Sequence, residues 1–178
     1  NIYIELDGPE IPICDGSALY FTQALLNAEL VELDEPRMYC YITEPISYTE
    51  GDKFAYVLPY HGLRVGVTIG FAHPLIGKQT LDLEMTEQSF VREIASARTF
   101  GFLKDVENLK SAGLAKGGSL DNCIVLDDTK VVNPEGLRFE NEFVRHKVLD
   151  ALGDLVTLEM PLMGHLVLHK AGHDIMNK

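Results

Sequence analysis

The residues with the clearest capacity for chemistry lie in one stretch, residues 143–154 (FVRHKVLDALGD). Read as a helix, this stretch places His146, Asp150 and Asp154 four residues apart on one face, with Lys147 beside them. An imidazole and a carboxylate one turn apart can both reach a single divalent ion, and a second carboxylate a turn further on could orient a ligand or a catalytic group. The spacing indicates a metal site, although it is also typical of a solvated polar face with one ordinary ion pair.

The helix that would carry these residues needs a buried face, and the sequence supplies one. Apolar residues recur at helical spacing on a different side from His146. They are Val144, Val148, Ala151, Leu152 and Leu155. We expect this stripe to hold the helix against a core whether or not a metal is bound.

The rest of the chain predicts a mixture of short strands and helices. Strands are expected at residues 1–6, 38–42, 46–49, 54–58, 63–71, 123–126, 131–132 and around 166–168, with a hairpin turn at Gly51-Asp52. Helices are expected at residues 17–30, 86–94 and 102–112, with Ser17 and Thr86 as N-caps, and a further helix begins near the C-terminal end. The mixture predicts an α+β fold in which helices cover one face of a sheet.

Five further segments share an order that is more specific than any one of them. They are residues 8–17 (GPEIPICDGS), 96–102 (SARTFGF), 117–122 (GGSLDN), 136–142 (GLRFENE) and 170–173 (KAGH). Together with the His146 helix, this series resembles the UDP-3-O-acyl-N-acetylglucosamine deacetylases, zinc amidases of bacterial lipid A synthesis. The resemblance covers residues 1–178. It implies hydrolysis of the N-acetyl group of UDP-3-O-(3-hydroxyacyl)-N-acetylglucosamine, with release of acetate.

The resemblance also implies how the chain is organised. The family has two domains, each a two-layer α/β sandwich, with the active site between them. Residues 1–34 would be the end of the first domain, and residues 37–178 the second, joined across the polar stretch at 32–36. The family carries a Glu-His pair upstream of the position of Asn1, which supplies a general base and a third zinc ligand. No Glu-His dipeptide occurs in this sequence, so we expect these 178 residues alone to be inactive.

The expected cofactor is Zn²⁺, held by His146 and Asp150, because a neutral nitrogen and an anionic oxygen suit zinc better than magnesium. A catalytic zinc needs three protein ligands, and the resemblance places the remaining one in the upstream part. His165, His169 and His173 form a competing histidine set, also spaced four apart. The apolar residues between the first two prefer a strand, which would leave His173 beyond its end.

Acid catalysis is expected from His173, which follows a glycine and so sits at a turn. A cationic imidazole beside the substrate amide could stabilise the developing oxyanion and protonate the leaving amine. The resemblance implies that Asp154 contacts this histidine and keeps it charged and oriented. It also implies that the hydroxyl of Thr99 donates to the same oxyanion. Without the family motif, a satisfied loop histidine is an equally good interpretation of His173.

The substrate-binding residues are predicted mainly from the resemblance. Lys147 is expected to meet a phosphate or the sugar carbonyl, and Phe71 to lie near the nucleotide. Residues 100–125 combine aromatic and aliphatic side chains with small residues that let backbone approach closely, which suits a narrow passage for a fatty chain. The passage is expected to involve Phe100, Phe102, Gly118 and Ser119, with Leu103, Val106, Leu109, Leu114 and Val125. Core packing would explain the same pattern.

Composition excludes several classes of protein. A hydrophobic content of 46% supplies a core, and the formal net charge of −12 without a basic stripe argues against a nucleic-acid partner. Cys14, Cys40 and Cys123 are too few and too widely spaced for a disulfide framework or a cysteine zinc site. The most apolar region, residues 57–76, is interrupted by His61, Arg64, His73 and two prolines, so no integral membrane segment is expected. We expect a cytoplasmic monomer.

Two other classes of function fit the sequence. The first is a non-catalytic fragment that binds an acyl chain or a nucleotide without hydrolysis. The second is a fusion, since some relatives continue into a 3-hydroxyacyl-carrier-protein dehydratase domain. A general zinc peptidase is disfavoured because no His-Glu-x-x-His motif is present.

Overall fold

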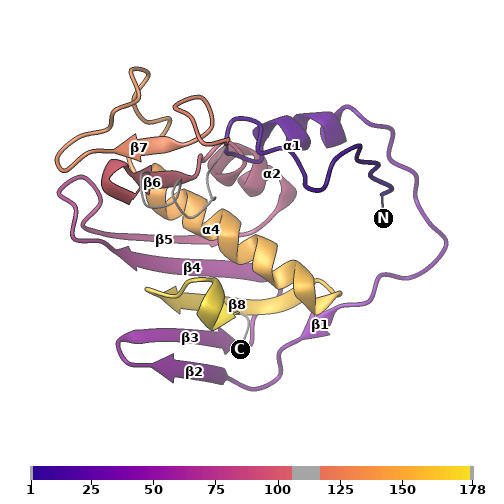
Figure 1. Ribbon diagram of the computed structural model, residues 1–178. Coiled ribbons are helices and arrows are strands. Elements are labelled where there is room, and N and C mark those ends of the chain that lie inside the picture. Colours follow the sequence, from indigo (N-terminus) through magenta and orange to yellow (C-terminus); the bar gives the residue numbers. More distant parts are fainter. Residues whose placement is uncertain (1, 106–116, 177–178) are drawn as a thin grey trace.

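The computed structural model describes residues 2–105 and 117–176, and its fold is α+β, as predicted (Figure 1). Its elements are α1 (Leu19–Leu26), β1 (Cys40–Tyr41), β2 (Ile46–Glu50), β3 (Lys53–Leu58), β4 (Leu63–Gly70), β5 (Lys78–Glu84), α2 (Glu87–Ser89), the π-helical turn η1 (Phe90–Ile94), β6 (Phe100–Phe102), β7 (Ile124–Leu126), α4 (Glu142–Leu155), the 3₁₀ turn η2 (Val156–Leu158), β8 (Leu162–His169) and α5 (His173–Met176).

The main sheet is organised around β8. Strand β4 pairs with one edge of β8 in parallel, while β3 pairs antiparallel and β1 parallel along the other edge. The hairpin partners β5 and β2 extend the sheet outward from β4 and β3. Strands β6 and β7 form a separate parallel pair.

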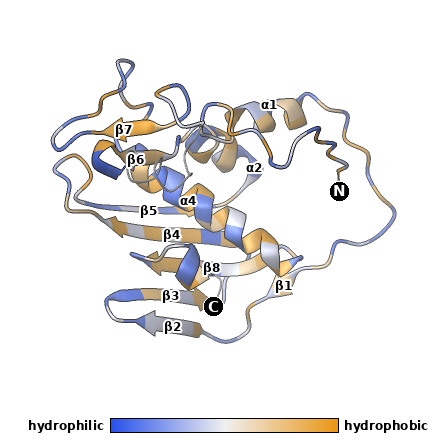
Figure 2. Ribbon diagram, in the orientation of Figure 1, coloured by the Kyte–Doolittle hydropathy of each residue, from blue (hydrophilic) through white to orange (hydrophobic). Residues whose placement is uncertain are grey.

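Helix α4 lies across one face of this sheet (Figure 1). Along β8, buried and half-buried residues alternate, because successive side chains of a strand point to opposite faces. Leu166 and Leu168 face the core, where they belong to the same cluster as Val144 and Val148 of α4. Bands of hydrophilic and hydrophobic residues alternate along α4, as expected for a helix with one buried side (Figure 2). The predicted apolar stripe therefore holds the helix on the sheet.

The connection from the sheet to the small β6–β7 pair begins at a capped turn. Thr86 is the N-cap of α2, and its hydroxyl accepts from the backbone N–H of Ser89, while the Ser89 hydroxyl accepts from Thr86 N. This capping box satisfies donors that the short helix leaves unpaired. It confirms the predicted N-cap. The chain then passes through η1 and reaches β6 along residues 95–99, a segment that packs against the beginning of α4.

The turn at residues 14–17 is fastened to this same region. Gly16 O accepts from Thr99 N at 2.8 Å, and the buried Asp15 pairs with Arg138 at 2.7 Å. Ser17 is buried beside them and donates to the Asp15 carboxylate. By contrast, α1 buries none of its residues, and a long loop leads from it to β1 along one side of the molecule (Figure 1). The N-terminal region is therefore anchored at one point.

The tightest part of this anchor predicts a large effect of Gly16→Ala. Gly16 has φ +80°, and an added Cβ would lie 2.1 Å from Asn122 O. Gly51 has a similar φ of +62° but nothing within 4 Å of an added Cβ. G51A should cost about 1–2 kcal/mol of unfolding free energy from backbone conformation alone, and G16A clearly more. Urea unfolding of the two variants and the parent measures the difference; equal losses would contradict the anchor.

Several predicted elements differ from the structure. Residues 2–6 form no strand and are exposed, because no neighbouring strand pairs with them. Helix α1 ends at Leu26, not Leu30, and its N-cap is Ala18, although the Ser17 hydroxyl still accepts from Leu19 N. Residues 131–132 contribute only a single bridge, from Val131 to Leu126. Most of the helix predicted at 102–112 lies outside the described residues.

Strand β5 was missing from the sequence-based expectations. Its residues alternate regularly between exposed and half-buried, with Leu81 and Leu83 on the inner side. The alternation of polar and apolar residues at 80–84 is the signal that would have identified it. Domain boundaries at 34 and 37 stay a prediction.

Candidate metal centre and active site

His146 is held in the tautomer that a metal ligand needs. It is 8% exposed, and its Nδ1 lies 3.0 Å from the carbonyl oxygen of Ala97. A carbonyl can only accept, so Nδ1 carries the proton and Nε2 keeps its lone pair. Burial lowers the pKa of the imidazole, opposed by the nearby charge of Asp150 and by the Ala97 hydrogen bond. The ring is therefore neutral near pH 7, and the solvated polar face is excluded for this residue.

Asp150 presents an oxygen to that lone pair. Its Oδ1 lies 3.4 Å from His146 Nε2. Two ligand atoms about 2.0–2.1 Å from a tetrahedral zinc ion are separated by about 3.3–3.4 Å, so the pair has the separation of two ligands of one ion. Two acceptor atoms facing each other also repel unless a cation or proton lies between them. His146 and Asp150 fit two of the three protein ligands of a catalytic zinc site. Within residues 2–105 and 117–176, no group of three or more His, Cys, Asp or Glu side chains could hold a metal.

Lys147 links this pair to the aromatic cluster. Its Nζ lies 2.8 Å from Asp150 Oδ2, the oxygen that does not face His146, and 5.6 Å from the centre of the Phe100 ring. The ammonium is thus held by a carboxylate on one side and a π face on the other. Phe100 in turn packs edge-on against Phe143 at the start of α4, with ring centres 5.1 Å apart. Lys147 therefore lies at the border between the His146–Asp150 pair and the aromatic side chains.

His173 and Asp154 are in direct contact, as the resemblance implied. His173 Nδ1 lies 2.8 Å and 2.9 Å from the two Asp154 oxygens, so α5 contacts α4 through this pair. The histidine side chain is 61% exposed, whereas the aspartate is 16% exposed. With Nδ1 directed at the carboxylate, Nε2 is on the opposite side of the ring.

A small cavity of about 20 Å³ joins the two pairs. It is lined by Lys147, Asp150, Ala151, Asp154, Leu168, Ala171, Gly172, His173 and Met176. That volume is close to the space one water molecule requires. The structure thus brings together the predicted ligand Asp150, the predicted acid His173 and Lys147 around one water-sized space.

Thr99 lies between α4 and the N-terminal anchor at residues 14–17. Its backbone N–H donates to Gly16 O, and its carbonyl accepts from Ile124 N. It is two residues after Ala97, whose carbonyl holds His146, so the backbone around Thr99 is fixed on both sides. Its predicted role as an oxyanion donor stays a prediction.

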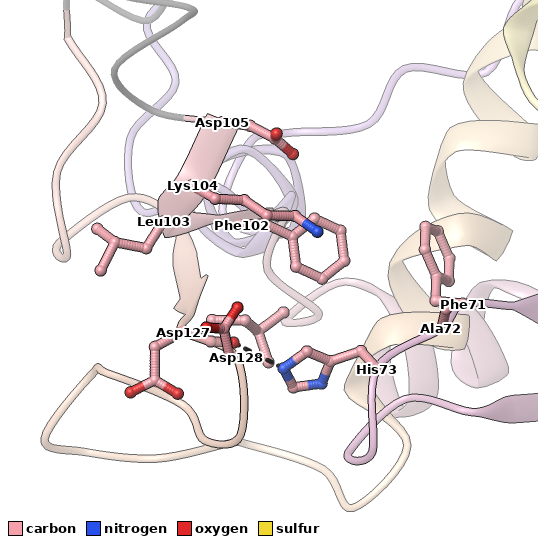
Figure 3. Close-up of a pocket in the computed structure, with 10 residues that line it drawn as sticks. Phe71, Ala72, His73, Phe102, Leu103, Lys104, Asp105, Asp127 and Asp128 are labelled. Atoms are coloured by element: carbon pink, nitrogen blue, oxygen red, sulfur yellow. Dashed lines mark hydrogen bonds between the residues drawn. The ribbon is translucent and has the colours of Figure 1, made fainter.

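A larger cavity, of about 650 Å³, is bordered by the aromatic side chains of Phe71 and Phe102 (Figure 3). It is lined by Phe71, Ala72, His73, Phe102, Leu103, Lys104, Asp105, Leu126, Asp127 and Asp128. Lys104 lies over the Phe102 ring, 5.5 Å from its centre, and His73 Nε2 lies 2.8 Å from Asp127 O. Phe71 contacts both Phe100 and Phe102, at 5.5 Å and 6.0 Å between ring centres. Phe71, Phe100 and Phe102 are therefore one cluster.

The other predicted residues are less well placed. Gly118 and Ser119 are exposed in the turn before β7, where the backbone N–H of Ser119 donates to the Asn122 side chain. Val106, Leu109 and Leu114 of the predicted acyl passage lie outside the described residues. The competing histidine set is not supported: His165 and His169 lie on β8 and His173 beyond it, so the three do not form a cluster.

Two contributors were not predicted from the sequence. The Ala97 carbonyl carries no side-chain signal at all. Glu142, the first residue of α4, is fully buried and ion-paired to Arg98. In the sequence it looks like an ordinary exposed acidic residue in the first turn of a helix, where negative charge is favourable.

Comparison with known proteins decides the family. A model of the family described as UDP-3-O-acyl N-acetylglycosamine deacetylase matches residues 1–178. The chain belongs to this deacetylase family. It is 74% identical to the UDP-3-O-acyl-N-acetylglucosamine deacetylase of Bdellovibrio bacteriovorus over 178 residues, which is all of this chain and 59% of that protein. The deacetylases of Myxococcus xanthus and Campylobacter fetus are 48% and 47% identical over the whole chain, which covers 57% and 60% of their lengths.

The chain therefore spans about three fifths of the length of the deacetylases it matches. Family membership confirms the resemblance on which the site residues were chosen, and the α+β fold agrees with it. In the part of the chain that the structure describes, no helix is both long and apolar enough to cross a lipid bilayer.

Proposed function

We propose that this chain carries the zinc-binding and acid-catalytic part of a hydrolase that removes the N-acetyl group of UDP-3-O-(3-hydroxyacyl)-N-acetylglucosamine, the committed step of lipid A biosynthesis. Its relatives are named as deacetylases of UDP-3-O-acyl-N-acetylglucosamine. The observation that carries the proposal is the 3.4 Å separation of His146 Nε2 and Asp150 Oδ1, next to the His173–Asp154 pair. We further propose that the enzyme is a cytoplasmic monomer.

His146 and Asp150 would hold the zinc ion, with a third ligand from the family's upstream Glu-His segment. When bound, the ion polarises the substrate carbonyl and activates water. Lys147 neutralises the outward oxygen of Asp150, at 2.8 Å, and so leaves the inward oxygen to face the metal. The same ammonium can meet a phosphate or sugar oxygen of the substrate.

His173 is proposed as the acid. Its Nδ1 is oriented by Asp154 at 2.8 Å, and the opposite nitrogen can donate a proton to the departing amine and a hydrogen bond to the oxyanion. Asp154 is only 16% exposed, so its charge acts on the imidazole with less screening by water than a surface carboxylate would. Thr99 would add a hydroxyl donor to the oxyanion from a backbone that is fixed by Gly16 and Ile124.

The two cavities are proposed to have different roles. The small cavity beside His173 is large enough for one water molecule, and the larger one around Phe71 would take the nucleotide, with aromatic faces for stacking and Lys104 for charge. Phe100 and Phe102, with Gly118 and Ser119, would border the fatty chain.

The test of the metal site uses an extended chain, defined here as these 178 residues preceded by the upstream segment of the Bdellovibrio relative. We expect His146→Ala and Asp150→Ala each to lose bound zinc, measured by elemental analysis after dialysis, because each removes one of three ligands. Both variants should remain folded by circular dichroism, since the apolar stripe of α4 holds the helix.

His165→Ala is the matched control, because this histidine belongs to the competing set but lies on β8. It should retain the zinc content of the parent. Undiminished zinc in both the His146 and the Asp150 variants would remove them as ligands. If the chain only binds its ligand, the extended chain would bind substrate but release no acetate. A fused dehydratase domain is tested by the sequence that follows residue 178.

A further inference from the structure

The peptide group between Ala97 and Arg98 is hydrogen-bonded at both of its ends to side chains of α4. Its carbonyl oxygen accepts from His146 Nδ1 at 3.0 Å. Its N–H donates to the Glu142 carboxylate at 3.0 Å. Glu142 and His146 are four residues apart on the helix, so their side chains lie one turn from each other on the same face. One peptide group therefore bridges the Glu142 carboxylate and the His146 imidazole, which lie one helical turn apart.

Glu142 has almost no freedom to move away. It is fully buried, and besides the Arg98 amide it accepts from Arg98 Nε at 2.9 Å, from Arg98 Nη2 at 3.2 Å and from Arg138 N at 2.6 Å. The Arg98 side chain is itself only 4% exposed, and its guanidinium also donates to Glu135 at 2.7 Å and to Gly136 O at 2.7 Å. A buried charge with this many donors is fixed in position, because losing any of them leaves a polar group unpaired.

The direction of the peptide follows from this arrangement. If the peptide turned over, its carbonyl oxygen would face the Glu142 carboxylate, and two acceptors would repel. With the N–H committed to Glu142, the carbonyl must face His146, and His146 must supply the proton from Nδ1. The negative charge on the N–H side also polarises the amide, which strengthens the bond that its carbonyl accepts.

We propose that Glu142 is a positioning residue for His146, acting through the Ala97–Arg98 peptide to keep the proton on Nδ1 and the lone pair on Nε2. The proposal rests on the proposed function in one respect, that Nε2 faces a zinc ion. Outer contacts of this kind orient a ligand and typically change metal affinity by 10- to 100-fold. Glu142 is not among the residues that line either of the two cavities, so we do not propose it as a substrate contact.

The experiment compares Glu142→Gln with Glu135→Gln. Glu135 also pairs with Arg98, at 2.7 Å, but does not touch the peptide. In the metal-free 178-residue chain with ¹⁵N-labelled histidine, NMR should find the His146 proton on Nδ1 in the parent and in E135Q, and a mixed or reversed tautomer in E142Q. In the extended chain, E142Q should bind zinc about 10- to 100-fold more weakly, while E135Q keeps the parent affinity.

Three results would overturn the proposal: a parent protein with the His146 proton on Nε2, an E142Q variant with parent tautomer and zinc affinity, or an E135Q variant as impaired as E142Q. The first needs no variant, so the proposal can fail even if E142Q does not fold. The tautomer is read without metal. A parent that binds no zinc but shows the expected tautomers therefore contradicts the proposed function and leaves the role of Glu142 supported.

Discussion

The 178 residues alone are expected to hydrolyse the N-acetyl substrate at least about 10²–10⁴-fold more slowly than the extended chain, because that range is the typical contribution of a general base. The loss of the third metal ligand would lower the rate further. The structure positions His146 and Asp150 as a pair, and the family resemblance places the third ligand and the base upstream of Asn1. Acetate release at saturating zinc is the measurement.

The control is an extended chain in which the upstream Glu-His pair is replaced by Ala-Ala. It has the same length and the same contacts at residues 14–17, so it separates the missing chemistry from any instability of the shorter chain. We expect it to be as inactive as the 178 residues alone. Turnover of the 178 residues within about tenfold of the extended chain would show that the base lies inside them.

Replacing His173 with alanine in the extended chain is expected to lower the maximal rate by about 10²–10⁴-fold, with a smaller change in substrate affinity. The reason is that an acid acts on the transition state more than on bound substrate. Asp154→Asn should reproduce part of this loss, since a neutral amide accepts from Nδ1 at the same place but does not stabilise the imidazolium. The double variant should be little worse than His173→Ala alone, because both residues serve one role.

Zinc content must be equal in all three variants for this comparison. Lys53→Ala is a suitable reference, because Lys53 forms an exposed ion pair with Asp174, next to His173 in sequence, without touching Asp154. It should keep the parent rate. Strictly additive losses in the double variant would contradict a shared role. Depleted zinc in Asp154→Asn would instead make Asp154 a ligand or a structural residue.

The sequence predicted the parts of the fold whose signals are local. The α4 stripe, the β2–β3 hairpin at Gly51 and the Thr86 cap each depend on a few neighbouring residues, and each is present. The strand predicted at residues 1–6 is wrong for residues 2–6, because alternation gives a strand only where another strand pairs with it, and no described strand does so. Strand β5 was not among the predicted strands, although polar and apolar residues alternate along it at 80–84.

The sequence indicated the candidate side chains of the site, but not the groups that hold those side chains in position. The spacing of His146 and Asp150 follows from helical periodicity, and the contact of His173 with Asp154 came from the resemblance, not from spacing. No pattern indicates that a carbonyl at Ala97 holds the imidazole, since every residue has one. The burial of Glu142 depends on Arg98, which is 44 positions away in sequence, and such a pairing is visible only in three dimensions.

The anchor at residues 14–17 has a consequence for assembly of the complete site. Gly16 is bonded to Thr99, close to the carbonyl that holds His146. A ligand or base carried on the chain just before this anchor would therefore be presented to the α4 pair at a high effective concentration, in the millimolar range for a short flexible connection. Even a weak upstream contact would then suffice when covalently attached. The same upstream segment supplied as a separate peptide should restore activity only at comparable, millimolar, amounts.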